Sequence, residues 1–458
     1  MNQRDDFPVM KTTSPSTSTS LLDRPVKATG DDAMVAKIAT SQTGYYEDPF
    51  LDAFCGSGDN GNGAHNNINN GSRTRTAGRS SVPGAGTVPT SNGRRRTVQP
   101  IIKRGTHARV CVVDRAITAF LKFKHKREAE AAACQVVVLG SGKDTSYFRF
   151  RNQNLMGMED DDERPAGEKT TTRSRQRRGP HPCQQTVHWY EVDHVSVIKE
   201  KASLIRKSSL LKSHCPMFIK TENGYESTGG GTSSLRSFSG SSSSSPSSTY
   251  HLIGHDLRDS PSLLFEKLDL NPRLPTLFVM ECVSMYVPIT ASQNLLQALS
   301  VSVDTVFLAC YEPILDGDSS KGGDPFGKVM ERNLVKRGVA SPDSCLLQTR
   351  TLRDQLHKLL GCKGFVRAVG CDMWSAYQTI VTAAQRKRAN ESEFMDEYEE
   401  WILIMRHYCF VVARGGLSPF TRHNPEHDLT RVFCKYNDEN RTRSPLGWVS
   451  DMCLEVEK

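Results

Sequence analysis

The sequence predicts an α/β fold, in which a mostly parallel sheet of seven strands has helices on both faces. An apolar, valine-rich run, Gln135 to Leu139, leads directly into Gly140-Ser141-Gly142 and then into a helix start. Further along the chain, strand and helix candidates alternate, which is the pattern of a sheet covered on both sides. A strand, a glycine turn and a helix in this order are typical of a nucleotide or nucleoside site. Two closely spaced glycines after valines are as often only a tight turn. The segments further along the chain therefore have to distinguish a ligand site from a simple turn.

The other strand candidates are short apolar runs bounded by turn residues. They are Val187 to Val192, Tyr250 to Ile253, Thr276 to Met280, Val306 to Tyr311, Phe365 to Val369 and Tyr408 to Ala413. Together with the run before Gly140 they make seven strands. This is one more than the dinucleotide-binding fold uses, and it suits a sheet whose last strand is reversed.

Helix signals fit between most of these runs. Asp324-Pro325 predicts a cap and a first-turn proline for a helix that Gly338 closes. A leucine-rich helix ends in the same way at Gly361. Before the glycine turn, we expect a helix capped by Asp114. Near the N-terminus, apolar residues at helical spacing start a folded segment at Asp31.

Long polar stretches divide the chain of 458 residues. We expect a disordered leader at 1–30, a disordered basic insert at 55–100, and further disordered inserts at about 157–182 and 226–249, because these stretches cannot bury enough apolar surface to offset the entropy of ordering. The folded parts are then an N-terminal segment, 31–54, and a domain at 101–414. A tail, 415–458, follows them.

The formal net charge of +8 comes from one region. Between Asn60 and Arg104 there is no acidic residue, and the basic residues there carry the whole excess. A basic segment can attract nucleic acid, but such inserts are more often solvated loops. The sequence contains no recognition-helix or ribonucleoprotein motif, so we do not expect nucleic-acid binding.

Thirteen cysteines occur without a CxxC spacing, which predicts neither a zinc site nor a disulfide framework. No apolar run is long enough to span a bilayer, and the N-terminus lacks the apolar core of a signal peptide. We therefore expect a cytoplasmic protein without a membrane or a metal ion as partner.

Acidic residues follow three successive strand candidates. The second strand ends at Asp193, the third is followed by Asp256, and the fourth is followed by Glu281. Ligands of open α/β sheets bind beyond the carboxyl ends of the strands. A carboxylate there can accept both hydroxyls of a ribose. Each acid alone is more often a helix cap, but three of them beside a glycine turn favour a nucleoside site.

Several stretches together resemble the leucine carboxyl methyltransferase family. They are VVLGSGKDTSYFR, YEVDHVSVIKEKASLI, LIGHDLRD, LPTLFVMECVSMYV, YEPILDGDSSKGGDPFGKVMERNL and EEWILIMRHYCFVVA. The resemblance covers roughly 31–54 and 101–414, apart from the inserts. It implies a class I S-adenosylmethionine-dependent methyltransferase, Rossmann-like, with an N-terminal helical lid. It also implies a monomer that methylates the C-terminal leucine carboxylate of the catalytic subunit of protein phosphatase 2A.

The resemblance also implies roles for single residues. Those expected to bind S-adenosylmethionine are Lys37 in the lid, Arg109 and Glu281 at the carboxylate and amino group of the methionine part, Gly140 in the glycine loop, Asp193 at the ribose, and Asp256 with Leu257 at the adenine. The catalytic pair would be Arg109 and Tyr286, which would position the incoming leucine carboxylate. Without the resemblance, we would interpret Arg109 as part of a surface salt bridge and Tyr286 as an aromatic residue of the core.

The sequence departs from the family pattern at the glycine loop, where Ser141 replaces the usual alanine, and in the insert that lengthens the chain before Asp193. A loop can absorb such an insert without moving the acid. Two alternatives remain. A related family methylates a carboxyl on a modified guanosine of transfer RNA, but it carries a β-propeller for which this chain has no repeat. A non-catalytic nucleoside-binding module would be favoured only if one of the three acids were missing.

Overall fold

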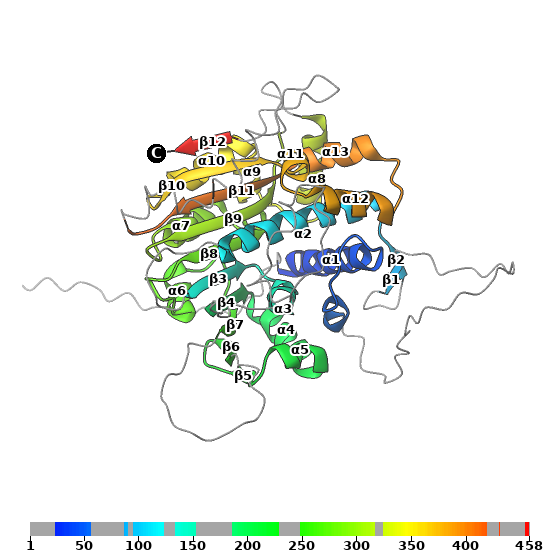
Figure 1. The fold of residues 1–458 in the computed structure, drawn as a ribbon. Coiled ribbons are helices and arrows are strands. Elements are labelled where there is room, and N and C mark those ends of the chain that lie inside the picture. Colours follow the sequence, from blue (N-terminus) through cyan, green and yellow to red (C-terminus); the bar gives the residue numbers. More distant parts are fainter. Residues whose placement is uncertain are drawn as a thin grey trace, which may run out of the picture.

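The computed structural model describes residues 23–55, 87–89, 95–122, 133–152, 186–228, 248–316, 324–418, 430 and 454–457. A single large sheet organises these residues, and helices cover both of its faces (Figure 1). Its strands run in the order β12-β10-β11-β9-β8-β3-β4-β7-β6-β5. Their bounds are β3 Ala133–Leu139, β4 Thr186–Asp193, β5 Ile219–Lys220, β6 Gly224–Thr228, β7 Thr249–Gly254, β8 Thr276–Glu281, β9 Val306–Pro313, β10 Phe365–Asp372, β11 Tyr408–Gly415 and β12 Leu454–Glu457.

The seven strands that the sequence predicts form the middle of this sheet. Neighbouring strands from β7 to β9 pair in parallel, whereas β11 pairs antiparallel with both β9 and β10. The last of the seven strands is therefore the reversed one, and it lies between the fifth and the sixth. This is the class I methyltransferase arrangement, so the predicted fold class is confirmed.

The strand count is larger than predicted, because ten strands join the sheet. β5 and β6 form an antiparallel hairpin beside β7, and β12 pairs with the opposite edge strand, β10. β5 is only two residues long and exposed, and only one residue of β6 is buried. These edge strands lack the apolar run on which a sequence-based prediction depends. β6 also extends into the segment 226–249 that we expected to be an insert.

The helices are α1 Asp23–Gln42, α2 Pro100–Leu121, α3 Ser146–Asn152, α4 Val195–Lys207, α5 Ser209–His214, α6 Pro261–Leu268, α7 Ile289–Ser300, α8 Pro325–Lys336, α9 Cys345–Gln348, α10 Leu352–Gly361, α11 Met373–Thr379, α12 Ala383–Ser392 and α13 Tyr398–Arg406, with the 3₁₀ turns η1 Leu51–Phe54 and η3 Ser284–Tyr286. The predicted cap is present, because the Asp324 side chain accepts the Phe326 N–H at 2.8 Å. A short pair of strands, β1 Thr87–Pro89 and β2 Arg95–Thr97, lies outside the main sheet.

Side chains of β3 alternate between two apolar cores. Val136 and Val138 pack in the core that includes residues of α1, α2 and α4, while Val137 and Leu139 pack on the other face with α6, α7 and α10. A parallel strand covered on both faces needs this continuous apolar composition. The carboxyl end of β3, which carries the glycine loop, is thereby held between two helical layers.

Two helices differ from the predictions at their starts. α1 begins at Asp23, within the stretch that we expected to be a leader. α2 begins at Pro100, so Asp114 is an interior residue of this helix and not its cap. The Asp114 carboxylate instead accepts a hydrogen bond from Arg149 of α3, at 2.8 Å. The early start of α2 is difficult to predict from the sequence, because Gly105 lies inside the helix and glycine is unfavourable in a helix interior.

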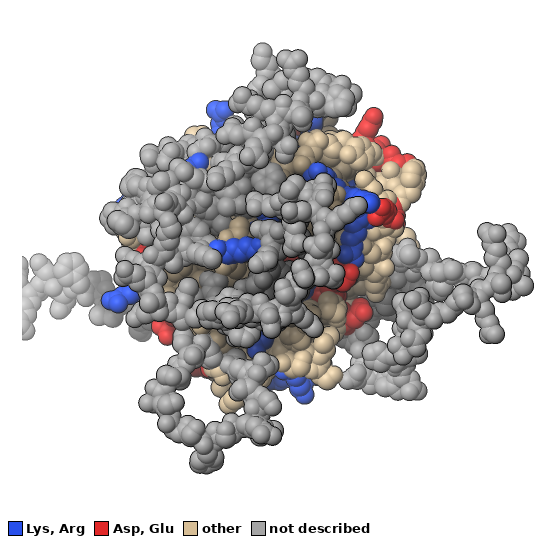
Figure 2. All heavy atoms as spheres, in the orientation of Figure 1, with Lys and Arg blue, Asp and Glu red and all other residues tan. Residues whose placement is uncertain are grey.

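β1, β2 and the first residue of α2 lie within the segment 55–100 that we expected to be an insert, and β12 lies within the expected tail. The expected insert at 157–182 lies wholly outside the described residues, as do most of the leader, of the other two inserts and of the tail. The described surface carries charged side chains of both signs. In Figure 2 acidic and basic side chains lie next to one another over α12 and α13. No helix among the described residues is both long enough and apolar enough to cross a membrane.

Candidate functional site

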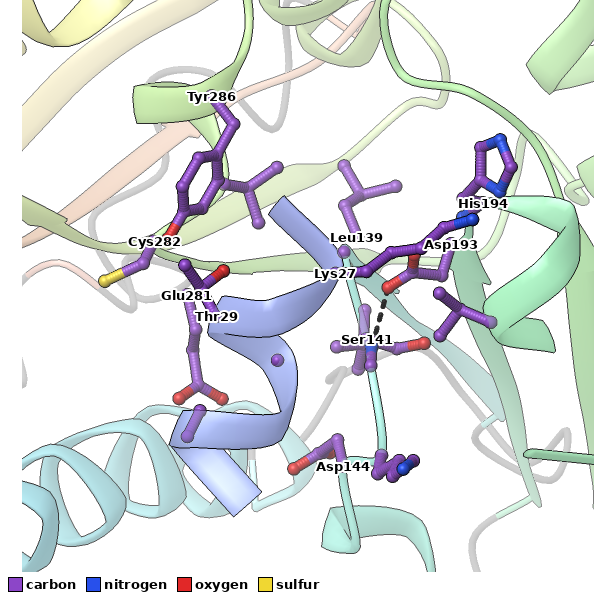
Figure 3. A pocket seen from close by; sticks show the side chains of 18 of the residues that line it. Lys27, Thr29, Leu139, Ser141, Asp144, Asp193, His194, Glu281, Cys282 and Tyr286 are labelled. Atoms are coloured by element: carbon purple, nitrogen blue, oxygen red, sulfur yellow. Dashed lines mark hydrogen bonds between the residues drawn. The ribbon is translucent and has the colours of Figure 1, made fainter. Parts of the chain in front are cut away.

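A cavity of about 610 Å³ lies beyond the carboxyl ends of β3, β4, β7 and β8. All of the residues that we predicted for the site line it: Lys37, Arg109, Gly140, Asp193, Asp256, Leu257, Glu281 and Tyr286. α1 runs across the cavity, with Glu281, Cys282 and Tyr286 on one side of the helix and Asp193 and His194 on the other (Figure 3). The tertiary structure thus brings residues of α1, α2, β4, β8, η3 and the loops after β3 and β7 to one site.

The glycine loop forms the floor of the cavity between these two sides. Gly140 has a φ of +67°, and a Cβ added there would lie 2.6 Å from a methyl group of Val283. The backbone N–H groups of Gly140 and Ser141 both donate to the carbonyl oxygen of Val192, at 2.8 and 3.1 Å. Any residue other than glycine at position 140 would therefore have a strained backbone conformation, and its Cβ would clash with Val283.

Asp193, the last residue of β4, is bonded to the glycine loop. Its Oδ2 accepts the Gly142 N–H at 2.7 Å, and its Oδ1 accepts the His194 N–H at 2.6 Å. Burial raises the pKa of the Asp193 carboxyl, although these two hydrogen bonds act in the opposite direction. The carboxylate oxygens have further lone pairs, which can accept hydroxyl groups of a ligand in the cavity.

Asp256 and Leu257 follow β7 at the same edge of the sheet. Burial acts to raise the pKa of Asp256, but hydrogen bonds and the charge of Arg258 lower it below its usual value. The Arg258 Nε lies 2.9 Å from one carboxylate oxygen of Asp256, and the Arg258 backbone N–H donates to the same oxygen at 3.0 Å. Leu257 provides an apolar surface beside this carboxylate.

Arg109 of α2 and Glu281 of β8 form an ion pair in the cavity, with 3.0 Å between Arg109 Nε and the nearer carboxylate oxygen of Glu281. The Arg109 guanidinium also lies over the Tyr311 ring, 5.5 Å from its centroid. Burial acts to lower the pKa of Arg109, but Glu281 and other neighbours raise it, so this side chain stays cationic. The cavity therefore presents a fixed positive and a fixed negative group side by side.

Tyr286 ends the 3₁₀ turn that follows β8, and its side chain lies near Glu281 and Cys282 (Figure 3). Burial raises the pKa of Tyr286 to about 12, while a hydrogen bond with Thr29 of α1 lowers it. The phenol is therefore neutral at physiological pH and can donate a hydrogen bond. Arg109 and Tyr286 line the same cavity from different elements.

Lys37 lies on α1, and its Nζ is 3.1 Å from an Asp144 carboxylate oxygen. Asp144 belongs to the glycine loop, so this ion pair joins α1 to the loop. A second, more exposed pair links the same elements, with 3.2 Å between Lys143 Nζ and an Asp31 oxygen. Asp144 is not among the residues predicted for the site, although it lies only two residues after Gly142 in the chain.

The acidic side chains that line the cavity are not gathered at one point. Among the described residues, no group of three or more His, Cys, Asp and Glu side chains is placed to hold a metal ion. The acidic groups are instead spread along the cavity, at the ends of β4, β7 and β8. Asp193 and Glu281 can accept hydrogen bonds from hydroxyl and amino groups, and Arg109 can donate to a carboxylate group.

The sequence of this chain is similar to those of several known proteins. The family model described as leucine carboxyl methyltransferase matches residues 26–169 and 174–300. Leucine carboxyl methyltransferase 1 of Rattus norvegicus is 29% identical over 322 residues, which cover 69% of this chain and 79% of that protein. The protein of the same name from Bos taurus is 25% identical and covers 88% of this chain and 93% of its own.

A similarly named homologue from Arabidopsis thaliana is 25% identical, with 85% of this chain and 88% of that protein covered. Among solved structures, a geranyl diphosphate methyltransferase in complex with GPP and sinefungin aligns with a TM-score of 0.31 and 9% identity, covering 69% of this chain and 81% of that one. The family model matches more than half of the chain, including α1, the glycine loop and the strand ends that line the cavity. The chain belongs to the leucine carboxyl methyltransferase family.

Proposed function

We propose that this protein transfers the methyl group of S-adenosylmethionine to the α-carboxylate of the C-terminal leucine of the protein phosphatase 2A catalytic subunit. The observation that carries the proposal is the Arg109–Glu281 pair in the cavity beyond the glycine loop. The methionine part of the cofactor has one carboxylate and one ammonium group. A guanidinium beside a carboxylate offers a partner for each of them.

The rest of the cavity fits the nucleoside part of the cofactor. Asp193 would accept the ribose hydroxyls with the lone pairs that its two backbone contacts leave free. Asp256 and Leu257 would hold the adenine, one by hydrogen bonding and the other by apolar contact. Gly140 would let the backbone approach the ligand where a Cβ would collide. Lys37 would hold α1 closed over the bound cofactor.

The chemistry requires little of the protein beyond orientation. S-adenosylmethionine would supply an electrophilic methyl group on its sulfonium. A C-terminal carboxylate has a pKa of about 3.3, so it is ionised at neutral pH and needs no general base. Arg109 and the neutral phenol of Tyr286 would hold this carboxylate in line with the methyl group, and α1 would exclude water from it. We therefore assign no catalytic base.

The experiment that tests this function is methyl transfer from labelled S-adenosylmethionine to the phosphatase catalytic subunit. The same substrate without its C-terminal leucine, and a transfer RNA acceptor, serve as parallel reactions. Arg109→Ala should abolish labelling. Arg353→Ala, which removes an exposed arginine on α10, should leave it unchanged.

Labelling that requires both the leucine and Arg109 would support the proposal. Labelling of transfer RNA alone would overturn the substrate but keep the cofactor. Cofactor binding without transfer to either acceptor would contradict the proposed reaction.

A further inference from the structure

Beneath the glycine loop lies a buried ion pair that takes no direct part in lining the cavity. Lys201 of α4 and Glu191 of β4 have side chains with 0% exposure, and the Lys201 ammonium is hydrogen-bonded to the Glu191 carboxylate. An isolated buried charge is strongly unfavourable, so each of these groups requires the other. Replacement of such a pair by apolar side chains of similar volume is often neutral for stability. Stability alone therefore does not explain why the fold holds these charges.

The contacts of Lys201 point to a role in the site. Its ammonium donates to the backbone carbonyl oxygen of Asp144 at 2.6 Å, and it lies 5.5 Å from the centre of the Phe54 ring. It thus joins three parts of the molecule: β4, the glycine loop, and the segment that follows α1. Of these parts, β4 and the glycine loop contribute residues to the walls of the cavity.

The partners of this ion pair connect it to the predicted ligand contacts. Glu191 lies two residues before Asp193 on β4, so both side chains lie on the same face of the strand. Lys201 donates a hydrogen bond to the backbone carbonyl oxygen of Asp144. The Asp144 carboxylate accepts hydrogen bonds from the Lys37 ammonium of α1 and from the Ser146 N–H, both at 3.1 Å. Lys201 therefore fixes the backbone that presents the anchor for α1.

We propose that Lys201 and Glu191 are positioning residues, which hold the glycine loop and the Asp144–Lys37 contact in the geometry that binds the cofactor. Neither residue touches the ligand itself. The inference rests on the proposed function, because it assumes that the ligand of this cavity is S-adenosylmethionine. It predicts that removal of the buried charges weakens cofactor binding while the fold persists.

The test uses the double variant Lys201→Met with Glu191→Gln, which keeps the side-chain volumes and removes both charges together. We expect the dissociation constant for S-adenosylmethionine, measured by calorimetry, to rise roughly tenfold or more, since a hydrogen bond to a charged group is lost at the loop. The midpoint of thermal unfolding should change little. The matched control is Lys103→Met with Glu393→Gln, which removes another lysine–glutamate pair away from the cavity and should leave the dissociation constant unchanged.

A second measurement tests whether the effect passes through Asp144. Lys37→Met should weaken cofactor binding in the wild-type background and have much less effect in the Lys201/Glu191 double variant, because coupled residues are not additive. Glu391→Gln, which removes an exposed ion pair with Lys387 on α12, away from the cavity, should have little effect in either background. A merely structural role would give additive effects instead.

The outcomes separate the inference from the proposed function. If the wild-type protein does not bind S-adenosylmethionine, the proposed function is wrong. If the wild type binds it and the double variant binds it equally well, only the inference is wrong. Should the double variant not fold, Glu191→Gln alone, which keeps the hydrogen bond and removes one charge, is measured in the same way, and an unchanged dissociation constant there would also contradict the inference.

Discussion

Arg109 and Glu281, which are separated by most of the α/β domain in sequence, meet inside the cavity with 3.0 Å between guanidinium nitrogen and carboxylate oxygen. Their side chains are only 17% and 15% exposed, so each charge is attracted by the other with little screening by water. The pair is preorganised before any ligand arrives. A ligand with an amino acid group can therefore bind without the protein first having to orient its charges.

We expect Glu281→Gln to weaken the binding of S-adenosylmethionine by roughly 10- to 100-fold, because the charged partner proposed for the ligand ammonium would be lost. The dissociation constant for 5′-methylthioadenosine should stay unchanged, since this ligand lacks the amino acid part. Calorimetry with both ligands checks the prediction. Equal losses for the two ligands would place Glu281 at the nucleoside instead.

A different pattern of ligand binding is expected for variants of Asp193, at the end of β4. Asp193→Ala should weaken binding of S-adenosylmethionine and of 5′-methylthioadenosine by a similar factor, because both ligands carry the ribose. The substitution also removes the acceptor of the Gly142 N–H. Asp193→Asn is the control for the loss of this hydrogen bond, since the amide oxygen of asparagine can still accept the Gly142 N–H. If Asp193→Asn bound both ligands as the wild type does, the ribose assignment would be wrong.

Gly140→Ala should abolish cofactor binding and destabilise the protein by about 1 to 3 kcal/mol, because the new Cβ meets Val283 at a positive φ. The control is Gly105→Ala in α2, where a Cβ meets nothing within 4 Å. That substitution should stabilise the protein by about 0.5 to 1 kcal/mol, as expected in a helix interior. Thermal unfolding and calorimetry measure the two effects.

Tyr286→Phe should lower kcat/KM for a peptide acceptor by roughly tenfold, the cost of one hydrogen bond to a charged group. The dissociation constant for S-adenosylmethionine should not change, because this residue is proposed to contact the acceptor. Steady-state kinetics at saturating cofactor test the first statement, and calorimetry tests the second. A loss of cofactor affinity instead would show that the Tyr286–Thr29 contact matters mainly for the closure of α1.

Burial, together with Arg104 and Arg388, lowers the pKa of His107 to about 4. The unfolded chain therefore takes up a proton at this residue below its ordinary pKa of about 6.5, while the folded chain does so only near 4. His107 should lower the free energy of unfolding by roughly 2 kcal/mol at pH 5 relative to pH 7.5. Denaturant unfolding of the wild type and of His107→Gln at the two pH values checks this. The variant should lose less stability on acidification, and an equal loss in both proteins would contradict the assignment.

The seven central strands and the acids at their ends could be predicted because the information is local. A run such as Gln135 to Leu139 is apolar at every position because both of its faces are covered, and the glycine turn follows it directly. Parallel pairing then places the carboxyl ends of neighbouring strands at one edge of the sheet. The position of Asp193 and Glu281 at one site follows from this rule without knowledge of the packing.

Only the tertiary structure decided which charges meet. The partners of Lys37, Arg109 and Lys201 lie on other elements, and no period or spacing in the sequence relates an ammonium to a carboxylate across the fold. The same holds for Asp114, which reads as a helix cap and is instead a partner of Arg149. Local apolar pattern determines strands and helices because burial is repeated along the chain, whereas an ion pair is a single long-range contact that exists only once those elements have packed.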